Sequence, residues 1–101
     1  MAKEVIWSFR AQRDRIEILN YWKERNKSKT YSIKLNALFE QTINLISEFP
    51  EIGRIVNIRG IRVKTIRDYS IFYFKEENSI EILIIWDNRR DPDVLQKILA
   101  G

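Results

Sequence analysis

The feature that most constrains this fold is a change of hydrophobic period at Pro50. Before it, apolar residues recur every three or four positions, which is the spacing of one helix face. That stripe consists of Tyr31, Leu35, Leu38, Thr42, Leu45 and Phe49, widened by Ile43 and Ile46. Pro50 ends the helix because its ring clashes with the preceding turn. Beyond it the period is that of β-strands, so the chain joins a helical first half to a stranded second half.

A second helix is predicted ahead of this one. Residues 5–7 form a short apolar run typical of a strand, and Ser8 can cap a helix that ends near Asn26. Asn26 suits that end because asparagine tolerates the left-handed conformation. Ser28 can cap the helix that carries the stripe. Because the link between the two helices is so short, they are expected to form an antiparallel hairpin.

The second half of the chain reads as strands followed by a short helix. Strands are predicted at 54–56, 61–67, 69–75 and 80–86, with a loop at 57–60 and a hairpin turn at 76–79. The run at 80–86 is nearly all apolar, as expected of a central strand covered on both faces. Asp91 can cap a last helix that starts at Pro92. We therefore expect one α+β domain over residues 1–101, with the helical hairpin packed on a mainly antiparallel sheet of four or five strands.

The missing residue types restrict the chemistry. The chain has no histidine and no cysteine. Zinc, iron–sulfur and haem sites are therefore not expected, nor is a Ser-His or Cys-His nucleophile, and we expect no cofactor. Acid–base work would fall to Lys, Tyr, Asp or Glu, with Arg as an electrostatic clamp. No apolar run approaches the length of a membrane span, and the absence of cysteine suits a cytoplasmic protein.

Positive charge is concentrated in one stretch. Residues 54–67 hold five basic residues and no acidic one, and two arginines follow the last strand. These candidates for binding an anionic target are Arg54, Arg59, Arg62, Lys64, Arg67, Arg89 and Arg90. Strand alternation puts Arg62 and Lys64 on the face opposite Ile61 and Val63. If those two pack under the hairpin, the cations form either a phosphate clamp on the other face or an ordinary solvated surface.

Two tyrosines lie on the following strand, Tyr69 and Tyr73. Because they are four residues apart, they share a face of that strand. They either pack in the core with a hydroxyl at its rim or supply a phenol to a site.

Several short motifs occur in a specific order. They are Val5-Ile6-Trp7-Ser8, Tyr21-Trp22, Pro50-Glu51-Ile52-Gly53, Arg62 followed seven residues later by Tyr69-Ser70-Ile71-Phe72-Tyr73, and Ile84 to Pro92. In this order and spacing the chain resembles the RelE/ParE superfamily of bacterial toxins from type II toxin–antitoxin systems. The resemblance implies a toxin that arrests bacterial growth, and it implies a cognate antitoxin as partner.

The superfamily holds two activities. RelE-like members cut messenger RNA in the ribosome without a metal, and ParE-like members inhibit DNA gyrase. By resemblance, Arg62, Lys64 and Arg89 match the basic residues of the RelE-like site, and Tyr69 or Tyr73 would have to replace its acid. Two positions depart from that pattern, since Ser70 stands for an arginine and Leu95 for the C-terminal catalytic tyrosine.

These departures favour a ParE-like gyrase inhibitor that is not an enzyme. A ribosome-dependent endoribonuclease is the alternative, and a non-toxic binding module is the third reading. In the family, antitoxins lay a helix and an extended segment across the hairpin and the sheet. The rings of Trp7, Tyr21 and Trp22 would be apolar anchors for that antitoxin, or else part of the hairpin core. A homo-oligomer remains open.

Overall fold

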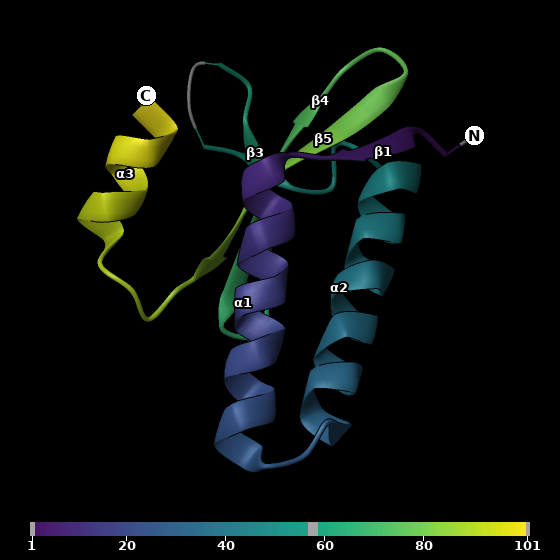
Figure 1. Cartoon of the computed structure of the whole chain (residues 1–101). Helices are drawn as coiled ribbons and strands as arrows, with labels where there is room; N and C mark the ends of the chain where they lie inside the picture. Colours follow the sequence, from purple (N-terminus) through teal and green to yellow (C-terminus); the bar gives the residue numbers. More distant parts are fainter. Residues whose placement is uncertain (1, 57–58, 101) are drawn as a thin grey trace.

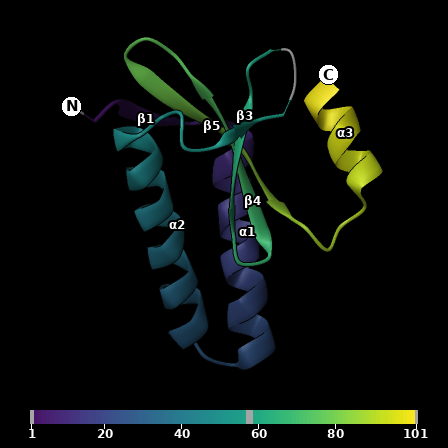
Figure 2. The ribbon, with the colours of Figure 1, turned by 180° about the vertical axis from the view of Figure 1, so that it is seen from behind.

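The computed structural model describes residues 2–56 and 59–100 (Figure 1). Helices α1 and α2 form an antiparallel hairpin that lies over a twisted sheet, and α3 stands beside the sheet (Figures 1 and 2). In chain order the elements are β1 (Glu4–Trp7), α1 (Phe9–Asn26), α2 (Thr30–Glu48), β2 (Arg54–Ile55), β3 (Arg62–Ile66), β4 (Tyr69–Lys75), β5 (Ser79–Asp87) and α3 (Pro92–Ala100). The predicted α+β fold is confirmed.

The sheet has five strands in the order β1-β5-β4-β3-β2. Strand β1 runs parallel to β5, and the other neighbouring strands are antiparallel. The strand expected at the centre, β5, is an interior strand but not the middle one, because β1 adds beyond it and leaves β4 in the middle. The predicted loop at 57–60 falls partly outside the described residues.

The ends of the two helices differ in detail from prediction. Ser8 caps α1 as expected, because its Oγ accepts a hydrogen bond from Ala11 N at 3.0 Å. Helix α1 ends at Asn26 as predicted, but the left-handed residue that follows is Lys27, with φ 52°, and not Asn26 itself. Lys29, and not Ser28, occupies the N-cap position of α2. Ser28 still helps to start that helix, since its Oγ accepts from Thr30 N at 3.2 Å.

The buried face of α2 is rotated from the predicted stripe. Leu35, Thr42, Ile43 and Ile46 are buried as expected, but the largest buried ring on this helix is Phe39. The last stripe members, Leu45 and Phe49, are 39% and 58% exposed. The predicted stripe runs parallel to the helix axis, and the buried residues lie on the neighbouring face along the whole of α2, which leaves Leu45 and Phe49 at the margin of the contact.

Two apolar clusters lie on opposite faces of the sheet. The hairpin-side cluster contains Ala11, Leu35, Phe39, Ile43, Ile46, Tyr69, Ile71, Tyr73, Ile80, Ile82 and Ile85. The second contains Ile61, Val63, Phe72, Ile84 and Trp86, with Leu95, Ile98 and Leu99 of α3 packed against it. Ile61 and Val63 therefore face α3 and not the hairpin, so the condition under which Arg62 and Lys64 would point away from the hairpin is not met. As predicted, α3 covers part of the sheet.

A β-bulge in β5 changes which of its residues face each cluster. Phe72 pairs with Ile84 but Tyr73 pairs with Ile82, so Leu83 is an extra residue. Because one inserted residue shifts the side-chain alternation, Ile82 and Ile85 lie on the same face. As a result, Ile80 and Ile82 face the hairpin before the bulge, whereas Ile84 and Trp86 face α3 after it.

Candidate functional site

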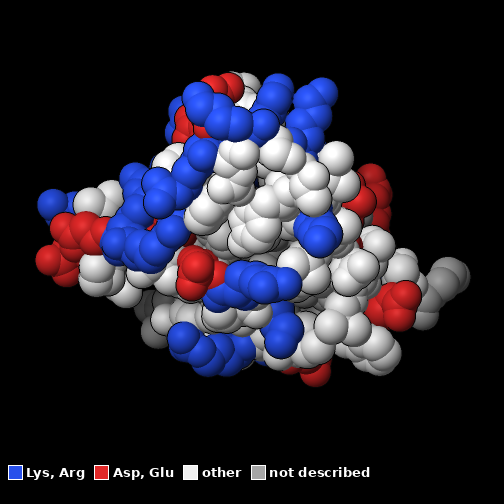
Figure 3. All heavy atoms as spheres, turned by 90° about the horizontal axis from the view of Figure 1, so that it is seen from below, with Lys and Arg blue, Asp and Glu red and all other residues white. Residues whose placement is uncertain are grey.

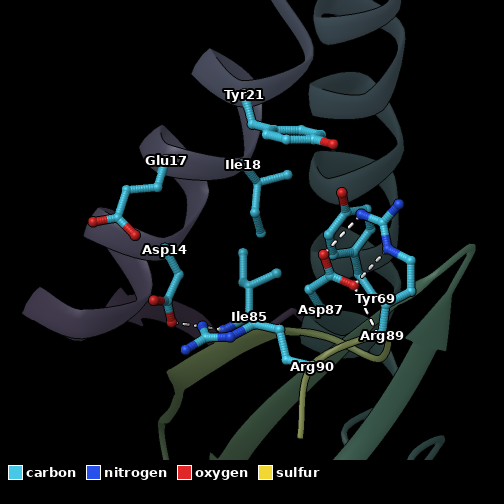
Figure 4. Close-up of a pocket in the computed structure, with 9 residues that line it drawn as sticks. All are labelled: Asp14, Glu17, Ile18, Tyr21, Tyr69, Ile85, Asp87, Arg89 and Arg90. Carbon is cyan, nitrogen blue, oxygen red and sulfur yellow. Dashed lines mark hydrogen bonds and ion pairs between the residues drawn. The ribbon is translucent and has the colours of Figure 1, made fainter. Parts of the chain in front are cut away.

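A cavity of about 440 Å³ lies between α1 and the end of β5. Figure 4 shows side chains from α1, the start of β4, the end of β5 and the segment after it surrounding this space. Its lining residues are Asp14, Glu17, Ile18, Tyr21, Tyr69, Ile85, Asp87, Arg89 and Arg90. The cavity thus joins four residues named from sequence (Tyr21, Tyr69, Arg89 and Arg90) with others that sequence reasoning missed.

The cavity exists because β1 is shorter than β5. Strand β1 ends at Trp7, opposite Ile82, which leaves the rest of that β5 edge without a strand partner. Helix α1 supplies side chains there instead. Ser8 Oγ donates to Leu83 O at 2.9 Å, and Asp14 Oδ2 accepts from Ile85 N at 3.2 Å.

Asp14 is only 6% exposed. Burial raises the pKa of its carboxyl, while the hydrogen bond from Ile85 and the nearby charges of Arg10 and Arg13 oppose that rise. Sequence reasoning missed Asp14, although a signal was present. It lies three residues after Ala11 and four before Ile18, on the face of α1 that turns toward the sheet.

The phenol of Tyr69 is held at the rim of the hairpin core. The ring is 2% exposed and packs edge-on against Phe39 at 5.6 Å between centroids. Its Oη accepts a hydrogen bond from Trp22 Nε1 at 2.7 Å. Burial raises the pKa of Tyr69, and the Trp22 hydrogen bond opposes the rise, so the phenol carries its proton at neutral pH.

The two arginines after β5 are held differently. Arg89 forms a two-pronged ion pair with Asp87, with Nε and Nη2 at 2.9 and 2.7 Å from the two carboxylate oxygens. The Arg89 hydrogen bond lowers the pKa of Asp87, and the same hydrogen bond raises the pKa of Arg89. The Arg89 guanidinium also lies 5.5 Å from the Trp22 ring, and Arg90 lies 4.4 Å from the Trp86 ring. Both arginines therefore keep a preferred direction at the cavity.

The basic residues of β3 do not line this cavity. Arg62 and Lys64 lie on the hairpin-side face of the sheet, because their cross-strand partners on β4, Tyr73 and Ile71, belong to the hairpin-side cluster. The Arg62 guanidinium donates to Gly53 O at 2.7 Å and to Glu51 O at 3.3 Å. Arg62 is therefore engaged in holding the segment after α2, while Lys64 is half-buried.

Tyr73 is also committed to that segment. It is fully buried, its Oη donates to Pro50 O at 2.8 Å, and it accepts from Gly53 N at 2.9 Å. Burial raises the pKa of this phenol as well. A proton that already bridges to a carbonyl inside the fold is poorly placed to reach a substrate, so Tyr73 is a weak substitute acid.

The remaining cations of the basic stretch are dispersed. Arg54 is exposed on the edge strand β2, and Arg67 is exposed in the β3–β4 turn with φ 57°. The Arg59 guanidinium lies at the end of α3, where its Nη2 donates a hydrogen bond to Ala100 O at 3.4 Å. The seven sequence candidates thus do not form one phosphate clamp.

The three ring candidates for antitoxin contact lie in two places. Trp7, at the end of β1, is half-buried with Arg15 4.6 Å from its ring. Tyr21 and Trp22 lie more than three turns into α1, with Tyr21 about 18 Å along the helix from its first residue, Phe9. Trp22 is half-buried against the core, whereas Tyr21 is 49% exposed. Of the three, Tyr21 offers the most accessible ring.

The positions that depart from the RelE-like pattern have structural roles here. Ser70 is buried and its Oγ donates to Asn88 Oδ1 at 2.8 Å, which ties β4 to the segment after β5. Leu95 packs against the second apolar cluster from α3. Within residues 2–56 and 59–100 no cluster of acidic side chains is arranged to hold a metal ion. Across the same ranges, no helix is long and apolar enough to cross a membrane.

The chain thus folds as a helical hairpin over a five-stranded sheet whose first strand runs parallel to its neighbour. A solved structure described as a chromosomal ParDE toxin–antitoxin system from P. aeruginosa has this fold, with a TM-score of 0.71 and 17% sequence identity over 83% of this chain and 94% of that chain. The family model for the ParE toxin of the type II parDE toxin–antitoxin system matches residues 5–92. The chain belongs to that ParE toxin family. No curated protein matches it.

Proposed function

We propose that this ParE-family toxin arrests bacterial growth by inhibiting DNA gyrase, and that a cognate antitoxin neutralises it by direct binding. One observation carries the choice of gyrase over messenger RNA. The residues that RNA cleavage would need are not assembled at one point, since Arg62 holds backbone carbonyls and Arg89 is paired with Asp87. Inhibition by binding needs no such constellation.

The cavity beside α1 is the proposed contact surface for the target. Tyr21 contributes a half-exposed ring, and Arg89 and Arg90 contribute directed charges next to it. Aromatic and arginine side chains of this kind are the residues that most often dominate binding energy at interfaces. An antitoxin segment that covers the same cavity would neutralise the toxin by exclusion.

A supercoiling assay with purified gyrase tests this proposal. The toxin should block supercoiling, and Arg89→Gln should weaken the block on the order of tenfold or more, as for an interface hot spot. Lys97→Gln is the matched control, because it removes one exposed positive charge from α3. Full supercoiling at a large excess of toxin would refute gyrase as the target.

Ribosome-dependent cleavage of messenger RNA is the second candidate. It is favoured by one observation, namely that the protonated phenol of Tyr69 and the charges of Arg89 and Arg90 line the same cavity. Toe-printing on translating ribosomes would then show cuts in phase with codons, and Tyr69→Phe would abolish them. A culture that grows normally while it produces the soluble chain without antitoxin would instead favour a non-toxic binding module.

Gyrase and ribosomes are both cytoplasmic, so the proposal implies that the toxin acts in the cytoplasm. Self-association is a separate matter, which sedimentation of the purified toxin would decide.

A further inference from the structure

A group of positive charges separate from the basic stretch at residues 54–67 lies at the tip of the helical hairpin. Residues 23–34 hold five of the 18 basic residues and one of the 14 acidic ones, so the remaining 13 of each sign cancel. We call the five the tip cations, and they are Lys23, Arg25, Lys27, Lys29 and Lys34. All five are exposed, and among the described residues none forms an ion pair.

The tip is placed to meet a partner. The hairpin extends beyond the sheet at this end, away from α3 (Figures 1 and 2). Viewed from this end, the molecule shows more Lys and Arg than Asp and Glu side chains (Figure 3). A projecting surface of unpaired cations attracts polyanions over distances of about a Debye length, roughly 8–10 Å in physiological salt.

Two tip cations, Lys27 and Lys29, occupy helix-end positions where other residue types are more stable. Lys27 adopts a left-handed conformation with φ 52°, where glycine or asparagine is preferred. Lys29 stands at the N-cap of α2 without a side-chain cap hydrogen bond, and a cation there opposes the helix dipole. Helix-end chemistry explains Lys23 and Arg25, which lie in the last turn of α1. It does not explain Lys27 and Lys29, and such departures point to function.

We propose that the hairpin tip binds the phosphate backbone of nucleic acid, independently of the cavity beside α1. Four of the five groups are lysines, which contact phosphates as point charges on flexible stems and do not form the planar fork used to read carboxylates or bases. The surface therefore suits backbone contact without base recognition. This inference goes beyond gyrase inhibition and holds for either proposed target, since each works on nucleic acid.

The test measures binding of the purified toxin to a fluorescent duplex DNA by anisotropy across a salt series, with no gyrase or ribosome present. If all five tip cations neutralise phosphates, the slope of log K against log salt is about −4.5. The double variant Lys27→Gly, Lys29→Ser should reduce it to about −2.7, while its melting temperature stays equal to or above that of the wild type. Arg13→Gln with Lys97→Gln is the control, because it removes the same net charge elsewhere.

The outcomes separate the alternatives. A control variant that loses as much affinity as the tip variant would show that only net charge matters, and would overturn the proposal. Equal affinity for polyglutamate at the same salt would also overturn it, in favour of an acidic protein segment. A parallel titration with duplex RNA distinguishes the two sources of phosphate. Stronger binding to DNA or to RNA would each support the proposal and would show which backbone the tip prefers. A failed gyrase assay with intact DNA binding would refute the target alone.

Discussion

Asp14 allows the sharpest test of how α1 completes the sheet. Its carboxylate replaces the missing strand neighbour of Ile85 by accepting that residue's buried N–H at 3.2 Å. Substitution by leucine keeps a side chain of similar size but leaves the amide without an acceptor. Substitution by asparagine removes the charge while an amide oxygen can still accept. Both variants lose the ion pair with Arg10, so their difference reports mainly the hydrogen bond to the β5 edge.

The expected difference follows from the cost of a buried, unsatisfied amide. That cost is about 1–3 kcal/mol, so Asp14→Leu should be less stable than Asp14→Asn by this amount. For a chain of this length, 1 kcal/mol corresponds to roughly 4–8 °C in melting temperature, so the two variants should differ by roughly 5–20 °C.

Thermal unfolding followed by circular dichroism at neutral pH measures this difference. Glu17→Leu is the control on the same helix, because Glu17 is exposed and its substitution leaves the β5 edge intact. Amide hydrogen exchange adds a local readout, since the Ile85 amide should lose protection in Asp14→Leu. An Asp14→Leu protein that melts at or above Asp14→Asn would refute the view that α1 satisfies this strand edge.

Three further outcomes are expected. Gly53→Ala should destabilise the fold by about 1–3 kcal/mol in urea unfolding, because the new Cβ would lie 2.7 Å from both Tyr73 Oη and Val63 O; an unchanged midpoint would contradict this. Arg89→Gln should alter stability by less than about 1 kcal/mol, since its ion pair with Asp87 is exposed, so any loss of toxicity in cells would reflect target contact and not unfolding. Because the folded-state pKa of Asp14 is raised, the stability of the wild type relative to Asp14→Asn should be highest below the unfolded pKa and should fall as pH rises through the folded pKa. Melting temperatures from about pH 3 to pH 8 would show this trend, and a constant difference would refute it.

Secondary structure followed closely from local signals. Strand β4 begins and ends where the aromatic run predicted, and Pro92 begins α3 with Asp91 Oδ1 accepting from Asp93 N. These elements are set by residues that lie within a few positions of one another. Helix α1 ends at Asn26 as predicted, while the left-handed residue and the N-cap of α2 each lie one position later than expected, at Lys27 and Lys29.

The candidate site was predictable in its residues more than in its grouping. Tyr69, Arg89, Arg90 and Tyr21 meet at one cavity, but Arg62 belongs to a different network with Gly53. Sequence spacing cannot show that two residues 47 positions apart, such as Trp22 and Tyr69, share a hydrogen bond.

By itself, the sequence determined the class of fold, because hydrophobic period, caps and turns act over short distances along the chain. Only the tertiary structure decided which sheet face each residue occupies, because the bulge at Leu83 inverts the alternation along β5, and α3, not the hairpin, covers Ile61 and Val63. The tertiary structure likewise made Asp14 part of a strand edge, because β1 stops short of the β5 residues that α1 then completes.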